Sequence, residues 1–321
     1  MKNKYLIRME NPEDCLIATD GNDIYYRLFH APVTAHLKNE MDCMQFHTPQ
    51  LQSIPYHEHT LGTETFIISQ GRFRGYCMGQ SFDMRPGDML HIQPWMGHGF
   101  LPLEPESRLN ILFMGFDYRR QVMDVRINLM QNFPGVDEDM KFREMFELAH
   151  GILPLRTLPV GPDVPAERIQ QLRRNGTGIR EHEFEGIKMQ LKVARYETEG
   201  VKEIWELFMK PGFYCEWDDF LPEYRMFYVT SGKIRFSVKT SSTETLTFDA
   251  EKENIVTIPQ CAPFGFEVIE EARMYDLDCS ARLQDLCEEY EARSAAGTLD
   301  KQRTLALCRE FGLNCTDFGC K

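Results

Sequence analysis

The sequence has no long apolar run and few features of an exported protein. No stretch approaches the 18 apolar residues that a membrane-spanning helix needs. Its first residues, MKNKYLIRMENPEDC, lack the apolar core of a secretory signal peptide. Ten cysteines in 321 residues fall below the density of a disulfide-stapled domain. We therefore expect a cytoplasmic protein whose cysteines are reduced thiols.

Positive charge and specialised loops are also scarce. The chain has 36 lysines and arginines against 49 aspartates and glutamates, which gives a net charge of −13. This excess of negative charge argues against nonspecific binding to nucleic acid or to anionic membranes. The sequence contains no glycine-rich phosphate loop, nucleophile elbow or helix-turn-helix pattern. The expected partner is therefore a small-molecule substrate, with no nucleic acid and no membrane.

Strand-like and helix-like stretches alternate along the chain, and the length favours two domains. Short apolar segments with glycine punctuation predict strands within 1–118 and again within 186–280. Between them, 119–185 is predicted to be a helical and proline-rich connection, with one helix after Asp137 and another after Pro165. Residues 281–321 are predicted to be a helical tail whose last helix ends near Gly312. These four ranges are the predicted domains.

Two segments of the chain repeat. The first pair is His57-x-His59-x4-Glu64-x6-Gly71 and Asp218-x-Phe220-x4-Arg225-x6-Gly232, at an offset of 161. The second pair is GDMLHIQPWMGH (87–98) and ENIVTIPQCAPF (253–264), at an offset of 166. Repeats this far apart predict two copies of one domain.

The first copy carries residues that bind metals. Residues i and i+2 of a strand point to the same face, so His57 and His59 project together and Glu58 points away. Glu64 and His98 come from other strands and are predicted to converge on the same point. Three imidazoles and a carboxylate suit a divalent transition metal, with open positions for water, substrate or dioxygen. Glu64 is predicted to be either a ligand or a general base.

These motifs resemble those of the cupin superfamily. The HxH, Glu and Gly of its first motif fit at full spacing, although the leading glycine is missing. In the second motif the step from Gly87 to His98 is kept, but Pro94 is one place late and Pro102 stands where the family has Asn. Because both halves match, the chain resembles a bicupin, similar to quercetin dioxygenases and oxalate decarboxylases. The resemblance implies a mainly β fold of two jelly-roll β-barrels and a homodimer.

The second copy departs from the motif at every ligand position. Asp218, Phe220, Arg225 and Phe264 replace the His, His, Glu and His of the first copy. We therefore predict a degenerate C-terminal cupin without a metal. An ion pair between Asp218 and Arg225, or a role for Arg225 in holding a substrate carboxylate, are both open interpretations.

Several residues are candidates for a substrate pocket near the metal. By the two-residue period, Phe66 and Ile68 share a face with Glu64, and Phe100 shares a face with His98. His47 and His91 are further candidates, although a plain structural role is an alternative for each. His182, within the charged run REHEFEG, is predicted to lie on a solvated face.

The predicted cofactor is one divalent transition metal per chain in the N-terminal domain. Fe(II) is the first choice, and Mn, Ni, Zn and Co are alternatives. The first functional hypothesis is a mononuclear non-heme dioxygenase acting on a small oxygenated substrate. The alternatives are a redox-neutral lyase, isomerase or decarboxylase acting on a sugar acid or keto acid, and a non-catalytic small-molecule-binding cupin.

Overall fold

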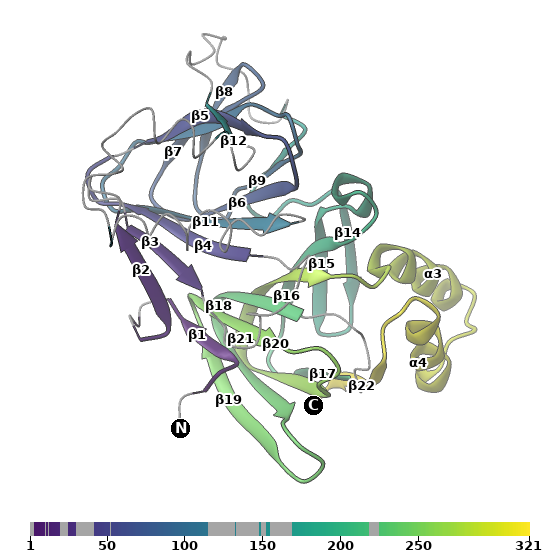
Figure 1. Ribbon diagram of the computed structural model, residues 1–321. Coiled ribbons are helices and arrows are strands. Elements are labelled where there is room, and N and C mark those ends of the chain that lie inside the picture. Colours follow the sequence, from purple (N-terminus) through teal and green to yellow (C-terminus); the bar gives the residue numbers. More distant parts are fainter. Residues whose placement is uncertain are drawn as a thin grey trace. The chain divides into compact units, whose positions relative to one another are not determined.

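The protein is mainly β and divides into two compact units (Figure 1). The computed structural model describes residues 3–9, 11, 13–19, 25–29, 42–51, 53–114, 132, 148, 152–154, 169–217 and 225–321. The first unit lies within Cys15–Thr177, and the second takes Met1–Asp14 and Gly178–Lys321. The predicted fold of two jelly-roll barrels is confirmed.

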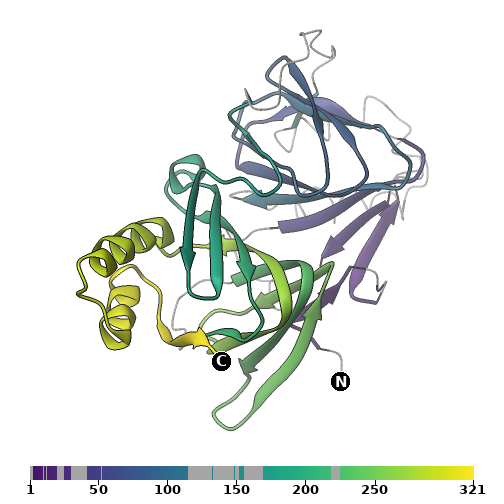
Figure 2. The ribbon, with the colours of Figure 1, turned by 180° about the vertical axis from the view of Figure 1, so that it is seen from behind.

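Two antiparallel sheets form the first unit and face each other across its core (Figures 1 and 2). The five-stranded sheet has the order β12 (Ile152–Pro154), β5 (Ile54–His59), β10 (His98–Pro102), β7 (Phe73–Cys77), β8 (Gln80–Met84). The seven-stranded sheet has the order β13 (Leu172–Arg173), β9 (Met89–Ile92), β6 (Thr63–Gln70), β11 (Ser107–Met114), β4 (Asp42–Thr48), β3 (Tyr25–Phe29), β2 (Cys15–Thr19). Strand β7 shows why the sheets pack, because Phe73 and Cys77 at alternate positions are buried in this core.

The segment predicted to be a helical connection instead adds strands to the first unit. Strand β12 pairs with β5 and strand β13 pairs with β9. The predicted helix after Pro165 is therefore wrong over its described residues, 169–176. Ile169 and Leu172 bury their side chains in the first core, and this packing outweighs the helical propensity of the segment. The predicted helix after Asp137 lies outside the described residues.

A single ten-stranded sheet runs through the second unit. Its main path is β1 (Leu6–Arg8), β20 (Asn254–Ile258), β18 (Arg225–Lys239), β21 (Phe264–Cys279), β16 (Glu203–Met209), β15 (Ile187–Val193), β14 (Arg180–Phe184). Strands β17 (Phe213–Trp217), β19 (Thr245–Glu251) and β22 (Cys315–Cys320) pair off this path, and a short 3-10 helix covers Arg195–Thr198. The sequence predicts that Met1–Asp14 belong to the first barrel. Strand β1 instead pairs with β20, so these first 14 residues belong to the second unit.

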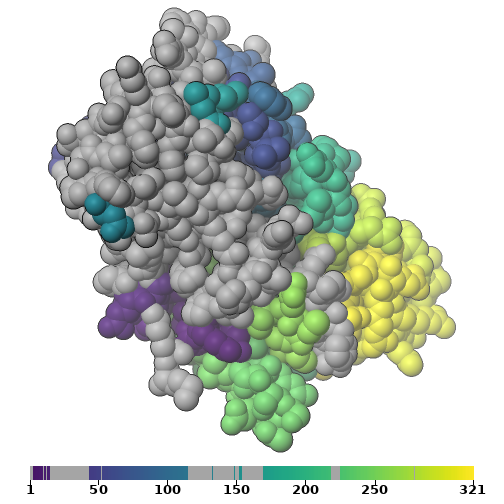
Figure 3. All heavy atoms as spheres, viewed as in Figure 1, coloured from purple at the N-terminus to yellow at the C-terminus, as the bar shows by residue number. Residues whose placement is uncertain are grey.

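The C-terminal tail is part of the second core. Helix α3 (Leu283–Ala295) buries Leu283, Leu286 and Cys287, and helix α4 (Lys301–Glu310) buries Leu307 and Cys308 in the same cluster as the strands. The two helices were predicted, but strand β22, which pairs with β17, was not. In the space-filling view of Figure 3 the yellow tail also presents an outer surface. The tail thus packs one face against the core of the second unit and exposes the other to solvent.

The charged run around His182 is not a solvated face. His182 is buried at 5% exposure, and its ring is hydrogen-bonded to Glu291 at 2.8 Å and to Gln284 at 3.3 Å. Both partners belong to α3, which packs against β14 at this point. The prediction of a solvated His182 is wrong because sequence alone does not show that the tail returns to cover this strand.

The glycine that ends each repeat is required by backbone geometry. Gly71 and Gly232 both have positive φ, at 74° and 78°. A Cβ at position 232 would lie 2.1 Å from the carbonyl oxygen of Glu271, and one at position 71 would lie 2.1 Å from Ser107 Oγ. Only glycine allows both the left-handed conformation and the close approach of the neighbouring strand.

Gly232→Ala is therefore expected to lower the free energy of unfolding by about 3 kcal/mol or more, because the strain of positive φ adds to a backbone clash. The matched control is Gly200→Ala. Gly200 also has positive φ (84°), but nothing lies within 4 Å of the added Cβ, so a loss of only about 1 kcal/mol is expected. Urea unfolding of the three proteins measures the difference. Equal losses in the two variants would show that the clash at 232 is relieved.

Candidate metal centre

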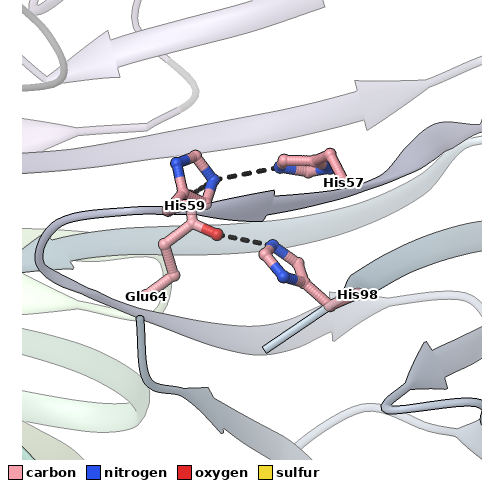
Figure 4. Close-up of side chains that lie close together, drawn as sticks. All are labelled: His57, His59, Glu64 and His98. Atoms are coloured by element: carbon pink, nitrogen blue, oxygen red, sulfur yellow. Dashed lines mark hydrogen bonds and ion pairs between the residues drawn. The ribbon is translucent and has the colours of Figure 1, made fainter. Parts of the chain in front are cut away.

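Three strands of the first unit bring together the four residues that the repeat analysis selected. His57 and His59 lie on β5, Glu64 on β6 and His98 on β10 (Figure 4). In the five-stranded sheet His98 is paired directly with His57. Because β6 belongs to the opposite sheet, Glu64 approaches from across the core. The cluster therefore sits between the two sheets of the barrel.

The spacing of the donor atoms fits one metal ion. His57 Nε2 lies 3.0 Å from His59 Nε2, and Glu64 places Oε1 3.1 Å from His59 Nε2 and Oε2 2.7 Å from His98 Nε2. All four donor atoms lie within 4.8 Å of one another. Two ligands held at right angles by bonds of about 2.1 Å would be about 3.0 Å apart. Over the described residues, this is the single cluster of histidine, cysteine and carboxylate side chains with such spacing.

Backbone carbonyls orient two of the imidazoles. His57 Nδ1 lies 2.7 Å from the carbonyl oxygen of Pro55, and His98 Nδ1 lies 2.8 Å from that of Met96. A carbonyl oxygen only accepts, so each Nδ1 carries the proton and donates it. A bound metal would then meet the Nε2 lone pair of each ring, because Nε2 faces the cluster. Donation of the second ring N–H to a carbonyl is the usual support of a metal-binding histidine.

Burial and mutual charge set the protonation of the cluster. Burial, with the neighbouring His98 and His59, lowers the pKa of His57 to about 3, so this ring is neutral near pH 7. Burial alone would raise the pKa of Glu64, but the charges and hydrogen bonds of His59 and His98 outweigh it and hold this pKa well below its ordinary value. Burial alone would lower the pKa of His59, but the Glu64 carboxylate outweighs it and raises this pKa above 6.5. Without a metal, Glu64 therefore stays ionised, and the His59 imidazole keeps its proton to a higher pH than usual.

This pair predicts how metal affinity depends on pH. A protonated His59 cannot bind a metal, so the ion must displace one proton at any pH below the pKa of His59. Affinity for Zn²⁺ is expected to fall about tenfold per pH unit below that pKa and to level off above it. Titration of the metal-free protein from about pH 5.5 to about pH 8.5 against a competing chelator measures the curve. A midpoint above 6.5 is expected, and one below 6.5 would contradict the influence of Glu64.

The aromatic pocket candidates lie beside the cluster. The ring of Phe66 is 5.5 Å from that of His98 and 4.4 Å from that of Phe100, between ring centroids. Phe66, Phe100 and Ile68 are all buried in the first core. The structure thus brings the two phenylalanines to the apolar side of the cluster, while Ile68 lies two residues further along β6.

His47 and His91 do not reach the cluster. His91 is paired with Thr65 across β9 and β6, and its Nδ1 lies 2.9 Å from Thr65 Oγ1. Thr65 is adjacent to Glu64 and so points to the other face of the sheet. His47 follows the core residue Phe46 and is bonded to Glu106 at 2.7 Å, also away from the core. A pocket role for these two histidines is not supported, because the pleat of the sheet turns them outward.

Strand register corrects the alignment of the second copy. His98 is paired with His57 in the first unit, and its counterpart Phe264 is paired with Trp217 in the second. Trp217, and not Asp218, therefore stands at the position of His57. Arg225 keeps the position of Glu64, since Glu64 pairs with Ile92 and Arg225 with its repeat equivalent, Ile258.

The partner of Arg225 also differs from the sequence interpretation. Its guanidinium forms a buried ion pair with Asp276 of β21 and lies over the rings of Trp217 and Phe227. Asp218 and Phe220 are outside the described residues. At the three described positions the second barrel thus has an indole, a guanidinium and a phenyl ring where the first has metal ligands.

Comparison with known proteins identifies the fold. No protein-family profile matches the chain, and no curated protein matches it in sequence. Among solved structures it is similar to oxalate decarboxylase from Bacillus subtilis at pH 4.6, with 16% identity, a TM-score of 0.53, and coverage of 94% of this chain and 84% of that one. A structure concerned with the Mn(II) centres of the same decarboxylase has 16% identity, a TM-score of 0.54, and coverage of 94% and 86%. At this identity the likeness is one of fold alone, and it agrees with the two jelly-roll barrels described above. No described helix is long and apolar enough to cross a membrane.

Proposed function

We propose that the chain is a metal-dependent cupin enzyme acting on a small organic acid, and that it is a redox-neutral decarboxylase or lyase. The observation that carries the proposal is the convergence of three imidazoles, two of them oriented by carbonyls, and one ionised carboxylate at a largely buried site. His57, His59, Glu64 and His98 would hold one divalent ion. The similarity in fold to oxalate decarboxylase, a protein described with Mn(II) centres, supports manganese and an acidic substrate.

A bound divalent ion would supply Lewis acidity towards a carboxylate or carbonyl oxygen of the substrate. The residues of the chain prepare the site for this chemistry. Glu64 is kept ionised by its two histidine neighbours, which suits a ligand or a base and not a proton donor. Phe66 and Phe100 keep water from the His98 side of the cluster, which strengthens electrostatic interactions there.

A dioxygenase using Fe(II) is the second candidate. The same donor set serves Fe(II), and the apolar side formed by Phe66 and Phe100 suits an aromatic or enol substrate. Dioxygen consumption separates the two candidates. The decarboxylase should release carbon dioxide without net uptake of oxygen.

The test begins with metal analysis of protein purified without oxygen. Near one manganese ion per chain is expected, together with carbon dioxide release from one or more of a panel of dicarboxylic and 2-oxo acids. Iron with substrate-dependent oxygen uptake would favour the dioxygenase. Metal bound at full occupancy without turnover of any acid, catechol or diketone would leave a binding protein.

For the second barrel we propose that it is degenerate and binds no metal. Trp217, Arg225 and Phe264 offer no ligand in place of His57, Glu64 and His98. A chain with His57→Ala and His59→Ala should then bind no metal at all, whereas retention of one ion would reveal a second centre. The homodimer stays a prediction, to be checked by sedimentation velocity.

A further inference from the structure

A cavity of about 220 Å³ lies inside the second unit, at the end of the barrel where the tail packs. Side chains of β15, β17, β18, β21, α3, α4 and β22 line it. The lining is mainly aromatic and aliphatic, and it includes Phe213, Phe227 and Leu286. Arg225 and Trp217, which occupy metal-ligand positions of the first barrel, line it as well. The second barrel has therefore kept an interior chamber while changing its chemistry.

One polar group of this chamber has no partner within the described part of the chain. Trp217 is 7% exposed, and its Nε1–H is buried without a hydrogen-bond acceptor among those residues. A buried donor without an acceptor costs free energy and calls for an explanation, because native structures leave few of them. The indole N–H can only donate. A ligand that meets it must carry an acceptor oxygen or nitrogen.

The charges in the chamber argue against an anionic ligand. The guanidinium of Arg225 is already matched by the Asp276 carboxylate, and both side chains are buried, at 4% and 3% exposure. An anion added here would be one uncompensated charge in an apolar site, which is expensive. The thiols in the wall do not change this balance, since burial raises the pKa of Cys287 and keeps it neutral.

We propose that the second barrel binds a small uncharged molecule with an aromatic or alkyl body and one carbonyl oxygen, which accepts a hydrogen bond from Trp217 Nε1–H. Since an apolar cavity of about 150 Å³ binds benzene, which has six non-hydrogen atoms, 220 Å³ holds a ligand of roughly nine. Side chains of α3, α4 and β22 line the chamber, so the tail is part of the binding site. This site is separate from the metal centre and does not depend on it.

Three probes of nine non-hydrogen atoms each test the assignment, by ligand-observed NMR on the full chain. Acetophenone has the apolar body and the carbonyl, cumene has a methyl group in place of the carbonyl oxygen, and benzoate adds a charge. Acetophenone is expected to bind with a Kd of about 1 mM or below. Cumene should bind about tenfold more weakly for lack of the hydrogen bond, and benzoate at least about tenfold more weakly because of its charge.

Variants locate the site. Trp217→Phe keeps a ring but removes the N–H, and should reduce acetophenone affinity about tenfold while leaving cumene unchanged. Leu286→Phe fills part of the chamber and should weaken both probes equally. His57→Ala should change neither, since it alters only the first barrel.

The proposal is overturned if acetophenone does not bind. It is also overturned if acetophenone and cumene bind the wild type with equal affinity and Trp217→Phe changes neither affinity. The third overturning result is that benzoate binds the wild type more tightly than acetophenone does. The last result would assign the chamber to an anion held by Arg225. Thermal melts of each variant confirm that it is folded before its binding is interpreted.

Discussion

Replacing His98 by alanine is expected to abolish metal binding by the first barrel. His98 is fully buried, it supplies one of four donor atoms, and its partner Glu64 would lose the contact that helps to keep it ionised. Metal content should fall from near one ion per chain to below about one-tenth, with an affinity loss of at least roughly 100-fold. Any metal-dependent turnover should fall with it. Elemental analysis after dialysis against a weak chelator measures the content.

The matched control for this experiment is His47→Ala. His47 was also a candidate from the sequence, but its ring is bonded to Glu106 on the outer face of the sheet. Metal content should stay at the wild-type value. If His47→Ala lost metal as His98→Ala does, or if both kept it, the cluster drawn in Figure 4 would not be the binding site.

The largest effect on stability is expected from Glu206→Ala in the second unit. Glu206 and Lys192 are both fully buried, and their side chains are 2.8 Å apart. Glu206 also pairs with Arg273. Removing the carboxylate would leave the Lys192 ammonium in the interior without this counter-charge, at a cost of about 3–5 kcal/mol.

Denaturant unfolding followed by tryptophan fluorescence measures this loss, since Trp205 and Trp217 both belong to the second unit. An exposed pair provides the comparison. Arg235 is bonded to Asp249 at 2.8 Å on the surface, and Arg235→Ala should leave the unfolding midpoint almost unchanged, because solvent screens such pairs. Equal unfolding midpoints for Glu206→Ala and Arg235→Ala would mean that another carboxylate compensates the charge of Lys192 once Glu206 is removed.

The sequence was most informative where a residue's role depends on local spacing. The HxH pair follows from the two-residue period of a strand, and the repeat located Glu64 and His98 across 34 positions. The orientation of His57 and His98 by carbonyls two residues earlier has no signal in residue type, because every residue carries a carbonyl. That support is visible only once β5 and the turn before β10 are in place.

Where tertiary packing decides, sequence interpretation failed. The segment around Leu172 has helical composition, yet it forms strand β13 because it pairs with the edge of β9. The one-residue error that aligned Asp218 with His57 has a similar origin, since spacing in the second copy is longer by one and only the Trp217–Phe264 pairing reveals it. His182 was misjudged because its cover comes from a tail more than 100 residues away.

The pairing of β1 with β20 has a consequence for biosynthesis. Leu6 leaves the ribosome some 250 residues before its partner Val256 is made. Strand β1 therefore stays unpaired while the metal-binding barrel is synthesised and can fold. The other strands of the ten-stranded sheet are made only afterwards. Closing so long a loop slows assembly more than it lowers final stability. Deleting Leu6–Arg8 should thus impair maturation of the C-terminal barrel while the metal-binding barrel still forms.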